Sequence, residues 1–470
     1  MFSVMKNSSI RYILAVVMLM ATSAAVAQEM QSAYFVKDYL FRHDLNPALG
    51  NEKNYISFPA LGNVNAEIRG NFGIGDVLFD NPMNNGKKKT TFMNPMISVK
   101  DALSGFKTGK NILSADIGVT VLSAGFKGMG GYNTIEIGVK GFAGLSLPYE
   151  FFEFAKNTGN KKYDLNDMAF RGQMYTEVGL GHSRQINEKL SVGAKAKFLF
   201  GVTRADIGVE NMRADLSADN QWILSGRANA DVSMKGFKYK TKTDTYEAKP
   251  GSYEYVDDVD VHGAGVSGVG LAADLGAVYR VNEDLTLSAA LTDLGFISWN
   301  NDMQATNIAN EFVFQGFHDA SVVNSDDPAS VDNQWDLYAD QLTEFVSLKS
   351  VGDKGGRTTA LATTIRLGGE YVLPSYRNLT FGLLATHRFN GPFSWTEGRV
   401  SANVAPLNWL DGGVNVAVHS FGASLGWIVN IHPKHFNLFI GMNHLCGKMS
   451  KEFIPLNSKS AFSLGVNYTW

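Results

Sequence analysis

Residues 64–74 read VNAEIRGNFGI, and apolar side chains occupy the even positions from Val64 while polar ones occupy the odd positions from Asn65. A period of two residues predicts a β-strand with one apolar and one polar face. The same alternation recurs at 113–121 and 135–147. Charged residues on the second face would be costly in a packed sandwich core, but a wet lumen or a solvated surface tolerates them. The sequence therefore predicts an all-β fold, and the alternation alone leaves lumen and solvated sheet open.

The composition narrows the choice. The chain has 48 Gly, 30 Phe, 17 Tyr and 12 Pro, with 45% hydrophobic residues, a balance that suits strands with one apolar and one polar face. Beyond the first residues, no stretch approaches the roughly 18 consecutive apolar residues of a membrane helix. The net charge of −3 provides no basic footprint for nucleic acid. The single cysteine, Cys446, excludes an intrachain disulfide.

A recurrent unit of strand, short polar turn and strand indicates how the strands are connected. Five copies occur, at 182–201, 278–296, 370–389, 404–422 and 429–447. Long polar connections separate them, above all 204–267 and 300–358. Short turns on one rim and long loops on the other are typical of outer-membrane barrels, in which the short turns face the periplasm. We therefore expect 204–267 and 300–358 to be extracellular loops.

Counting strands backwards from Trp470, with alternating direction, predicts a transmembrane antiparallel β-barrel of about 14 strands over residues 63–470. The predicted strands are 63–75, 111–127, 132–147, 170–185, 189–203, 268–281, 284–299, 359–373, 378–390, 396–405, 410–418, 423–431, 436–447 and 460–470. Six short turns then lie on one rim, at 128–131, 186–188, 282–283, 374–377, 406–409 and 432–435. Two short connections, 391–395 and 419–422, fall on the other rim with the long insertions. Short helices are expected in the connections, at 98–106, 148–155 and 332–349.

The final strand, AFSLGVNYTW, resembles the C-terminal recognition signal of bacterial outer-membrane barrels. One face carries only large apolar side chains: Phe462, Leu464, Val466, Tyr468 and Trp470. The resemblance implies that barrel-assembly machinery and outer-membrane lipid are partners of the chain.

The first 27 residues predict a secretory signal peptide. Two basic residues precede an apolar run that is too short to span a membrane, and Ala25 and Ala27 stand before Gln28 in an A-x-A cleavage pattern. We therefore expect cleavage before Gln28 and localisation in the outer membrane.

Residues 28–62 precede the first barrel strand and are too irregular to form one. They are rich in apolar residues, so we expect a hatch or plug held inside the barrel. The candidate hatch residues are Tyr34, Phe35, Asn46, Pro47 and Ala48. A disordered periplasmic leader is the alternative.

No cofactor or metal site is predicted. The glycines of 263–270 match G-x-G-x-x-G, but they precede a strand instead of opening a helix, which argues against a nucleotide site. His432 and His435, with His444 and Cys446 further on, superficially suggest zinc ligands. The histidine pair falls in a short turn beside a proline, so ordinary turn residues are the favoured interpretation.

No catalytic site is predicted either. The chain contains no G-x-S-x-G element. His182 and Ser183 are sequence neighbours, and neighbours on a strand point to opposite faces. The chain is therefore not expected to be an enzyme.

Several short elements resemble a known group of proteins. They are YF at 34–35, LNPAL at 45–49, FPALGNV at 58–64, LSLPYEFFEFAKNTG at 145–159 and LTDLGFISW at 291–299. Together they are similar to the uncharacterised outer-membrane barrel proteins of Bacteroidota. Those proteins are distantly similar to FadL-type fourteen-stranded transporters and to PorV-type barrels of the type IX secretion system, whose N-terminal segments also carry an NPA element. The resemblance implies that residues 28–62 are the hatch.

The resemblance also sets the expected function. The leading hypothesis is FadL-like passive uptake or binding of a small hydrophobic ligand, without chemistry or cofactor. The chain lacks a recognisable match to the FadL fatty-acid site, so the substrate does not carry over. A docking or shuttle component of protein export, as in PorV-type barrels, is the second hypothesis. An outer-membrane hydrolase is the third.

Overall fold

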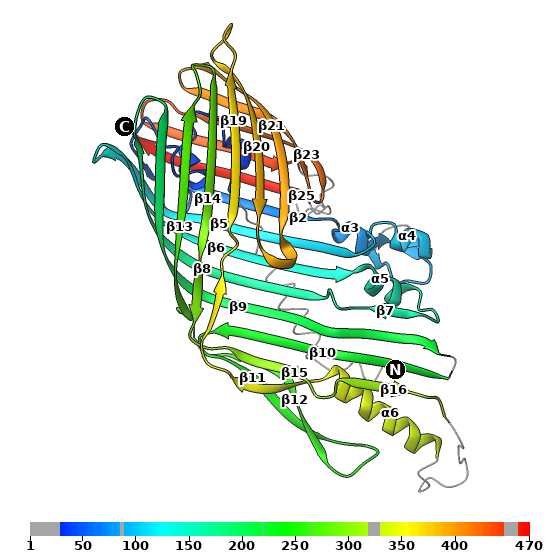
Figure 1. The fold of residues 1–470 in the computed structure, drawn as a ribbon. Coiled ribbons are helices and arrows are strands. Elements are labelled where there is room, and N and C mark those ends of the chain that lie inside the picture. The colour runs from blue at the N-terminus through cyan, green and yellow to red at the C-terminus, as the bar shows by residue number, and fades with distance from the viewer. Residues whose placement is uncertain (1–28, 85–88, 219, 264, 318–329, 446–458) are drawn as a thin grey trace.

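The computed structural model describes residues 29–470 apart from 85–88, 219, 264, 318–329 and 446–458 (Figure 1). The predicted signal peptide, with Ala25, Ala27 and Gln28, therefore lies outside the described residues, as does Cys446. None of the helices in the described part is long and apolar enough to cross a membrane.

Fourteen antiparallel strands form a closed barrel, as the sequence predicts. Closure is visible at β2, where Val64 pairs with Leu464 of the last strand on one side and with Val119 of the next strand on the other. Around the wall the strands are β2 (Asn63–Gly70), β5 (Lys110–Gly128), β6 (Gly131–Pro148), β8 (Ala169–Gln185), β9 (Leu190–Ala218), β13 (Gly268–Arg280), β14 (Leu285–Trp299), β19 (Thr364–Val372), β20 (Leu379–Arg388), β21 (Trp395–Leu407), β22 (Leu410–His419), β23 (Gly422–Ile431), β24 (Phe436–His444) and β25 (Lys459–Thr469).

The barrel wall is apolar outside and polar inside. On β22 the outward Val414, Val416 and Val418 are 63%, 51% and 64% exposed, whereas the intervening Asn415 is buried. On β13 the outward Leu271 and Leu275 are likewise exposed, while Asp274 between them faces inward and is buried. Exposed aliphatic side chains on a closed barrel need lipid as their solvent, so this is a membrane-spanning wall.

Most short turns lie on one rim of the barrel and the long connections lie on the other, as predicted. The rim formed by 129–130, 186–189, 281–284, 373–378, 408–409 and 432–435 is called the short-turn rim below, and the opposite one the loop rim. Two of the shortest connections, 389–394 and 420–421, belong to the loop rim, so the separation has the exceptions that the sequence indicates.

The two insertions expected as long loops contain much regular structure. β9 runs past the barrel to Ala218 and pairs there with β10 (Gln221–Met234), which pairs in turn with β15 (Met303–Asn307) and β16 (Glu311–Phe314). These strands form a sheet that projects from the loop rim (Figure 1). β17 (Leu348–Asp353) pairs with β15 in this sheet, and α6 (Val331–Val346) packs beside β15 and β16. The hairpin of β11 (Phe237–Thr245) and β12 (Ser252–Val261) forms a separate two-stranded sheet. The polar character of 204–267 misled the prediction, because a sheet outside the membrane can be solvated on both faces.

The helices expected in the connections are present, on the side of the molecule where the loop rim lies. They are α4 (Val99–Leu103), α5 (Tyr149–Lys156) and α6, and Ser98 and Ser330 cap α4 and α6 with side-chain oxygens. An aromatic core beside the rim includes Phe106 stacked on Phe152 of α5, with 3.6 Å between ring centroids. Around it are α3 (Ile74–Val77), β3 (Leu78–Asp80), η3 (Pro82–Asn84) and β4 (Lys89–Thr91). The remaining short elements are β7 (Lys162–Asp164), β18 (Arg357–Ala360) and η4 (Gly391–Phe393).

Residues 29–54, called the N-terminal segment below, lie inside the barrel near the short-turn rim (Figure 1). The segment contains η2 (Gln31–Ala33) and α2 (Arg42–Leu45). It is followed by β1 (Tyr55–Ser57), which joins the wall between β5 and β25, so that residues 28–62 are not wholly irregular. The core around the segment includes Tyr39, Phe41, Tyr55 and the wall residue Phe439.

Candidate functional site

The NPA element of the N-terminal segment contacts two neighbouring strands of the wall. Asn46 Nδ2 donates to Tyr34 Oη at 3.0 Å and reaches the carbonyl oxygens of Ala277 and Ala289, on β13 and β14, at 3.5 and 3.3 Å. Its Oδ1 accepts the backbone N–H of Ala48 at 3.0 Å. One amide therefore shapes the turn of the segment and attaches that turn to two strands.

Two wall glycines make room for this turn. A Cβ at Gly276 would lie 2.0 Å from Asn46 Oδ1, and a Cβ at Gly193 would lie 2.1 Å from the carbonyl oxygen of Pro47. Real atoms do not approach so closely, so a side chain at either position would displace the NPA turn. The close approach explains why inward positions of β13 and β9 carry glycine here.

The aromatic pair of the segment is seated in the same way. Tyr34 shares a hydrogen bond with Ser288 Oγ at 3.0 Å, and its ring packs edge-on against Phe35. A Cβ at Gly382 would lie 2.2 Å from the Phe35 ring, and Leu384 closes the cluster. All five predicted hatch residues are buried and lie in the lumen, and Asn46 is hydrogen-bonded to both Tyr34 and Ala48.

Buried ion pairs also hold the N-terminal segment against the wall. Lys195 Nζ lies 2.9 Å from Asp44 of the segment and 3.3 Å from Glu136 of the wall. Arg366 reaches Glu29 at 2.6 Å and donates to the carbonyl oxygen of Leu45 at 3.2 Å. Breaking a buried pair costs more than forming it contributes, so these contacts specify one position of the segment.

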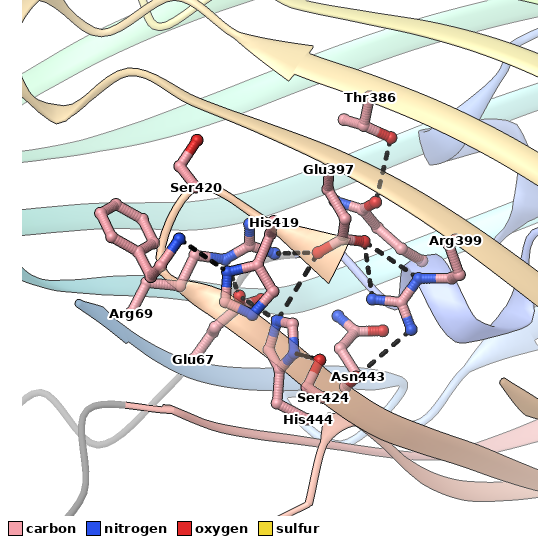
Figure 2. A network of polar contacts seen from close by, with 12 residues as sticks. Glu67, Arg69, Thr386, Glu397, Arg399, His419, Ser420, Ser424, Asn443 and His444 are labelled. Atoms are coloured by element: carbon pink, nitrogen blue, oxygen red, sulfur yellow. Dashed lines mark hydrogen bonds and ion pairs between the residues drawn. The ribbon is translucent and has the colours of Figure 1, made fainter. Parts of the chain in front are cut away.

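A larger polar network lines the wall between β2, β21 and β24 (Figure 2). Glu397 accepts from Arg399 Nη2 at 2.7 Å and pairs with Arg69 at 3.5 Å, while Arg69 also pairs with Glu67. Arg399 Nη1 donates to Ser32 Oγ of the N-terminal segment at 3.1 Å. The network therefore extends from the wall into the segment.

Part of this network has the order of a nucleophile, a base and an acid. Ser424 Oγ lies 2.6 Å from His444 Nδ1, and His444 Nε2 lies 3.1 Å from Glu67 Oε1 (Figure 2). Such a chain can in principle activate a serine, and the sequence does not indicate it because its members come from three strands. Glu67 is tied to Arg69, however, and the described lining of the chamber below includes none of the three. We therefore assign these residues to the wall network.

Between the N-terminal segment and the loop rim lies a cavity of about 590 Å³, called the chamber below. Glu29 of the segment contributes to its lining, and so do residues 357–363 and 389–391 of the loop rim. Five basic and four acidic side chains line it: Lys140, Arg171, Arg204, Arg357, Arg388, Glu29, Asp116, Asp206 and Asp293. Its volume suits a small ligand, but most ligand pockets are lined mainly by apolar groups, and this one is not.

The charged side chains of the chamber form ion pairs whose nitrogen–oxygen distances differ. Arg171 Nε donates to Asp206 at 2.8 Å, whereas Arg388 and Asp116 are 3.3 Å apart. Lys140 stands 3.9 Å from Glu29, beyond direct hydrogen bonding. The looser pairs leave donors and acceptors that a polar solute can engage.

The other predicted residues are placed as follows. On β25 the five large apolar residues face outward, and Tyr468 and Trp470 are exposed with stacked rings at the short-turn rim. Their role in barrel assembly stays a prediction. His435 is exposed in its turn. His432 is buried beside Asp411, a contact that could not be inferred from the sequence.

Comparison with solved structures finds barrels with low similarity. The Ralstonia pickettii toluene transporter TbuX has 9% identity and a TM-score of 0.42, with 94% of each chain covered. The Pseudomonas putida toluene transporter TodX has 9% identity and a TM-score of 0.40, covering 95% of this chain and 94% of its own. A Pseudomonas aeruginosa FadL homologue has 10% identity and a TM-score of 0.36, covering 90% and 91%. At these values neither a ligand nor a mechanism transfers to this chain.

Sequence comparison is more decisive for the family. No curated protein shows significant similarity to this chain. A family model described as "Family of unknown function (DUF5723)" matches residues 47–443, from the NPA element to the penultimate strand of the barrel. The chain thus belongs to the DUF5723 family of unknown function, in agreement with the resemblance to an uncharacterised barrel family.

Proposed function

We propose that this protein is an outer-membrane barrel that is closed by its own N-terminal segment and takes up or binds a small ligand passively. The observation that carries the proposal is the seat of the NPA turn against Gly193 and Gly276, with the chamber on the far side of the segment. Binding in the chamber and displacement of the segment would suffice for passage. The mechanism needs no covalent chemistry and no cofactor.

The charged chamber favours a small polar ligand over the hydrophobic one that the family resemblance suggests. TbuX and TodX are toluene transporters, and hydrophobic uptake by this chain remains the alternative. An apolar solute in the chamber would remove water from nine charged side chains without replacing their hydrogen bonds, which is costly. A solute with carboxylate, ammonium or hydroxyl groups would replace them.

Uptake into proteoliposomes tests both parts of the proposal. We expect vesicles with the refolded full chain to admit small charged solutes, such as radiolabelled amino acids, faster than empty vesicles do. We expect no comparable acceleration for an apolar fluorescent probe that enters the membrane by itself only slowly. Acceleration of the apolar probe alone would favour the hydrophobic ligand, and no acceleration of either solute would contradict uptake.

A docking role for exported proteins is the second candidate, and the projecting sheet favours it. Trp222 and Trp335 are 51% and 53% exposed there, and Phe317 stacks on Trp335 with 6.1 Å between centroids. Exposed aromatic side chains in groups often mark protein contacts. Capture of surface-exported proteins by the wild-type barrel, and not by a Trp222→Ser, Trp335→Ser variant, would support docking. Equal capture by both would count against it.

A further inference from the structure

Three side chains that could hold a metal ion meet where the N-terminal segment contacts the short-turn rim. Asp38 belongs to the segment, Asp411 is the second residue of β22, and His432 follows the last residue of β23. His432 Nε2 lies 3.4 Å from Asp411 Oδ1 and 3.8 Å from Asp38 Oδ2. One potential ligand atom from each residue lies within 4.8 Å of the others.

The imidazole ring of the histidine in this group lacks hydrogen bonds among the described residues. His432 is only 5% exposed, and within the described part of the chain neither of its ring nitrogens has a hydrogen-bond partner. A buried polar atom without a partner is costly and calls for an explanation such as a bound ion. Asp411 keeps lone pairs free, although it already accepts the Asp38 N–H at 3.0 Å and Asn430 Nδ2 at 2.6 Å.

A second cluster of histidine and carboxylates in the same lumen has its negative charge neutralised by a lysine. His43, Asp44 and Glu136 also come together, but there the ammonium group of Lys195 lies between both carboxylates. His43 Nδ1 is moreover hydrogen-bonded to the carbonyl oxygen of Leu40 at 3.0 Å. That cluster already contains its cation.

The Asp38 and Asp411 carboxylates have no such cation close by. Among the described residues, no Lys or Arg nitrogen lies within 4.0 Å of either one. The ammonium group of Lys53 is used by the carbonyl oxygen of His432 at 2.9 Å. Arg42 acts on both carboxylates only from a greater distance.

We propose that Asp38, Asp411 and His432 bind one divalent transition-metal ion, with Zn²⁺ as the first choice. One imidazole and two carboxylates form a three-ligand set that leaves one position for water. A cavity of about 10 Å³ beside Asp38 and His432 has room for about one such water. Coordination bonds of about 2.0–2.2 Å in a tetrahedral site place two ligand atoms about 3.3–3.6 Å apart. The present separations of 3.4 and 3.8 Å between His432 and the two carboxylates therefore need only small side-chain adjustments to accept the ion.

The proposed ion would tie the N-terminal segment to the wall. Asp38 belongs to the segment, whereas Asp411 and His432 belong to the barrel, so the metal would bridge the two parts at the short-turn rim. The site does not depend on what the barrel transports. Its failure would leave the proposed uptake untouched, and failed uptake would leave the site standing.

Zn²⁺ titration of the refolded full chain in detergent, without a histidine tag, tests the site. All proteins carry Cys446→Ser, which removes the single thiol as a competing ligand. The test variants are Asp38→Asn and His432→Gln, and the matched control is His435→Gln in the same turn. Asp38 is suited to substitution because its side chain is 29% exposed and only its backbone N–H holds Asp411.

We expect the parent protein to bind one Zn²⁺ per chain by calorimetry and to show a raised melting temperature. We expect both test variants to lose more than about tenfold in affinity, since loss of even an outer-shell partner costs about that much. The His435→Gln control should bind like the parent. Absence of Zn²⁺ binding to the parent, or unchanged affinity in either test variant, would overturn the proposal.

Discussion

The half of the lumen near the short-turn rim is filled by the N-terminal segment, whereas the half near the loop rim holds the charged chamber. Strand β9 passes through both halves and shows the difference along one line. Its inward position at Gly193 is bare where the NPA turn packs, and Lys195 then pairs with Asp44 of the segment. Further along, Arg204 lines the chamber. Along this strand, a bare glycine and a lysine that pairs with the segment are thus followed by an arginine that faces open space.

The largest predicted effect comes from breaking the charge balance on the filled side. Lys195→Met leaves Asp44 and Glu136 buried without their cation, so we expect a loss of about 3–5 kcal/mol in the free energy of unfolding. Urea titration of the folded, heat-modifiable gel band in detergent measures it. Lys189→Met, at an exposed position in the turn before β9, is the control and should change little. Equal stability of the two variants would mean that the ion pairs do not hold the segment.

The next effect comes from filling a glycine position. Gly276→Leu introduces atoms where Asn46 now lies, so we expect the segment to leave its seat at a cost of about 1–3 kcal/mol. Faster proteolysis of residues 29–54, with the barrel band intact on gels, reports the displacement. Gly398→Leu is the matched control, because a Cβ there meets no atom within 4 Å and the position is exposed. A protected segment in Gly276→Leu would show that the close approach is not decisive.

A smaller effect is expected on the open side. In the Gly276→Leu background, Arg388→Gln removes one positive charge from the chamber and leaves Asp116 without its partner. We expect the reversal potential in a salt gradient to shift toward cation selectivity, because a ring of fewer cations repels cations less. Arg377→Gln, exposed at the short-turn rim and paired with Asp284, is the control. A shift of the same size in the control would place the selectivity outside the chamber.

The smallest effect concerns the projecting sheet. The backbone N–H groups of Glu247 and Ala248 donate to the carboxylate of Asp340 on α6. The pKa of Glu247 is raised above its ordinary value of 4.5, mainly by repulsion from the nearby carboxylate of Asp336. A raised pKa means that ionised Glu247 disfavours this contact. The contact between the 247–248 backbone and α6 is therefore strongest when the pH is below the ordinary pKa of Glu247, and it weakens as the pH rises through the raised pKa.

Hydrogen exchange of the Glu247 and Ala248 amides measures this dependence. We expect protection, corrected for the intrinsic rate, to fall between pH 4 and pH 7 by an amount below about 1 kcal/mol, because the groups are exposed to solvent. Asp336→Asn should flatten the dependence. Protection that rises with pH in the wild type would contradict the assignment.

The wall could be predicted from the sequence because each strand carries its own two-residue alternation. The fourteen strands, the six short turns and the helices near 98–106, 148–155 and 332–349 are all found in the structure. Some strands differ in length from the prediction: the strand predicted at 63–75 ends at Gly70 and α3 begins at Ile74, whereas the strand predicted at 189–203 continues to Ala218. The sheet within 204–267 could not be predicted in the same way. Strands such as β11, which is mostly exposed, carry alternating polar residues on both faces and resemble a solvated loop.

The candidate site was predictable only in part. The apolar and NPA residues of 28–62 predicted a segment inside the barrel, and their burial in the lumen agrees with that. The chamber and the group of Asp38, Asp411 and His432 depend on pairings between distant strands. His432 stood out in the sequence, but its neighbours in space come from 21 and 394 positions earlier in the chain.

Single-channel conductance in planar bilayers shows whether the N-terminal segment closes the barrel. The full chain is compared with a chain lacking residues 29–54, which keeps β1 in the wall. Heat-modifiable migration of both proteins establishes that each barrel is folded. In simple salt, without a small polar ligand to displace the segment, we expect the full chain to stay closed and the shortened chain to show stable conductance steps. Equal conductance of the two folded barrels would contradict closure by the segment.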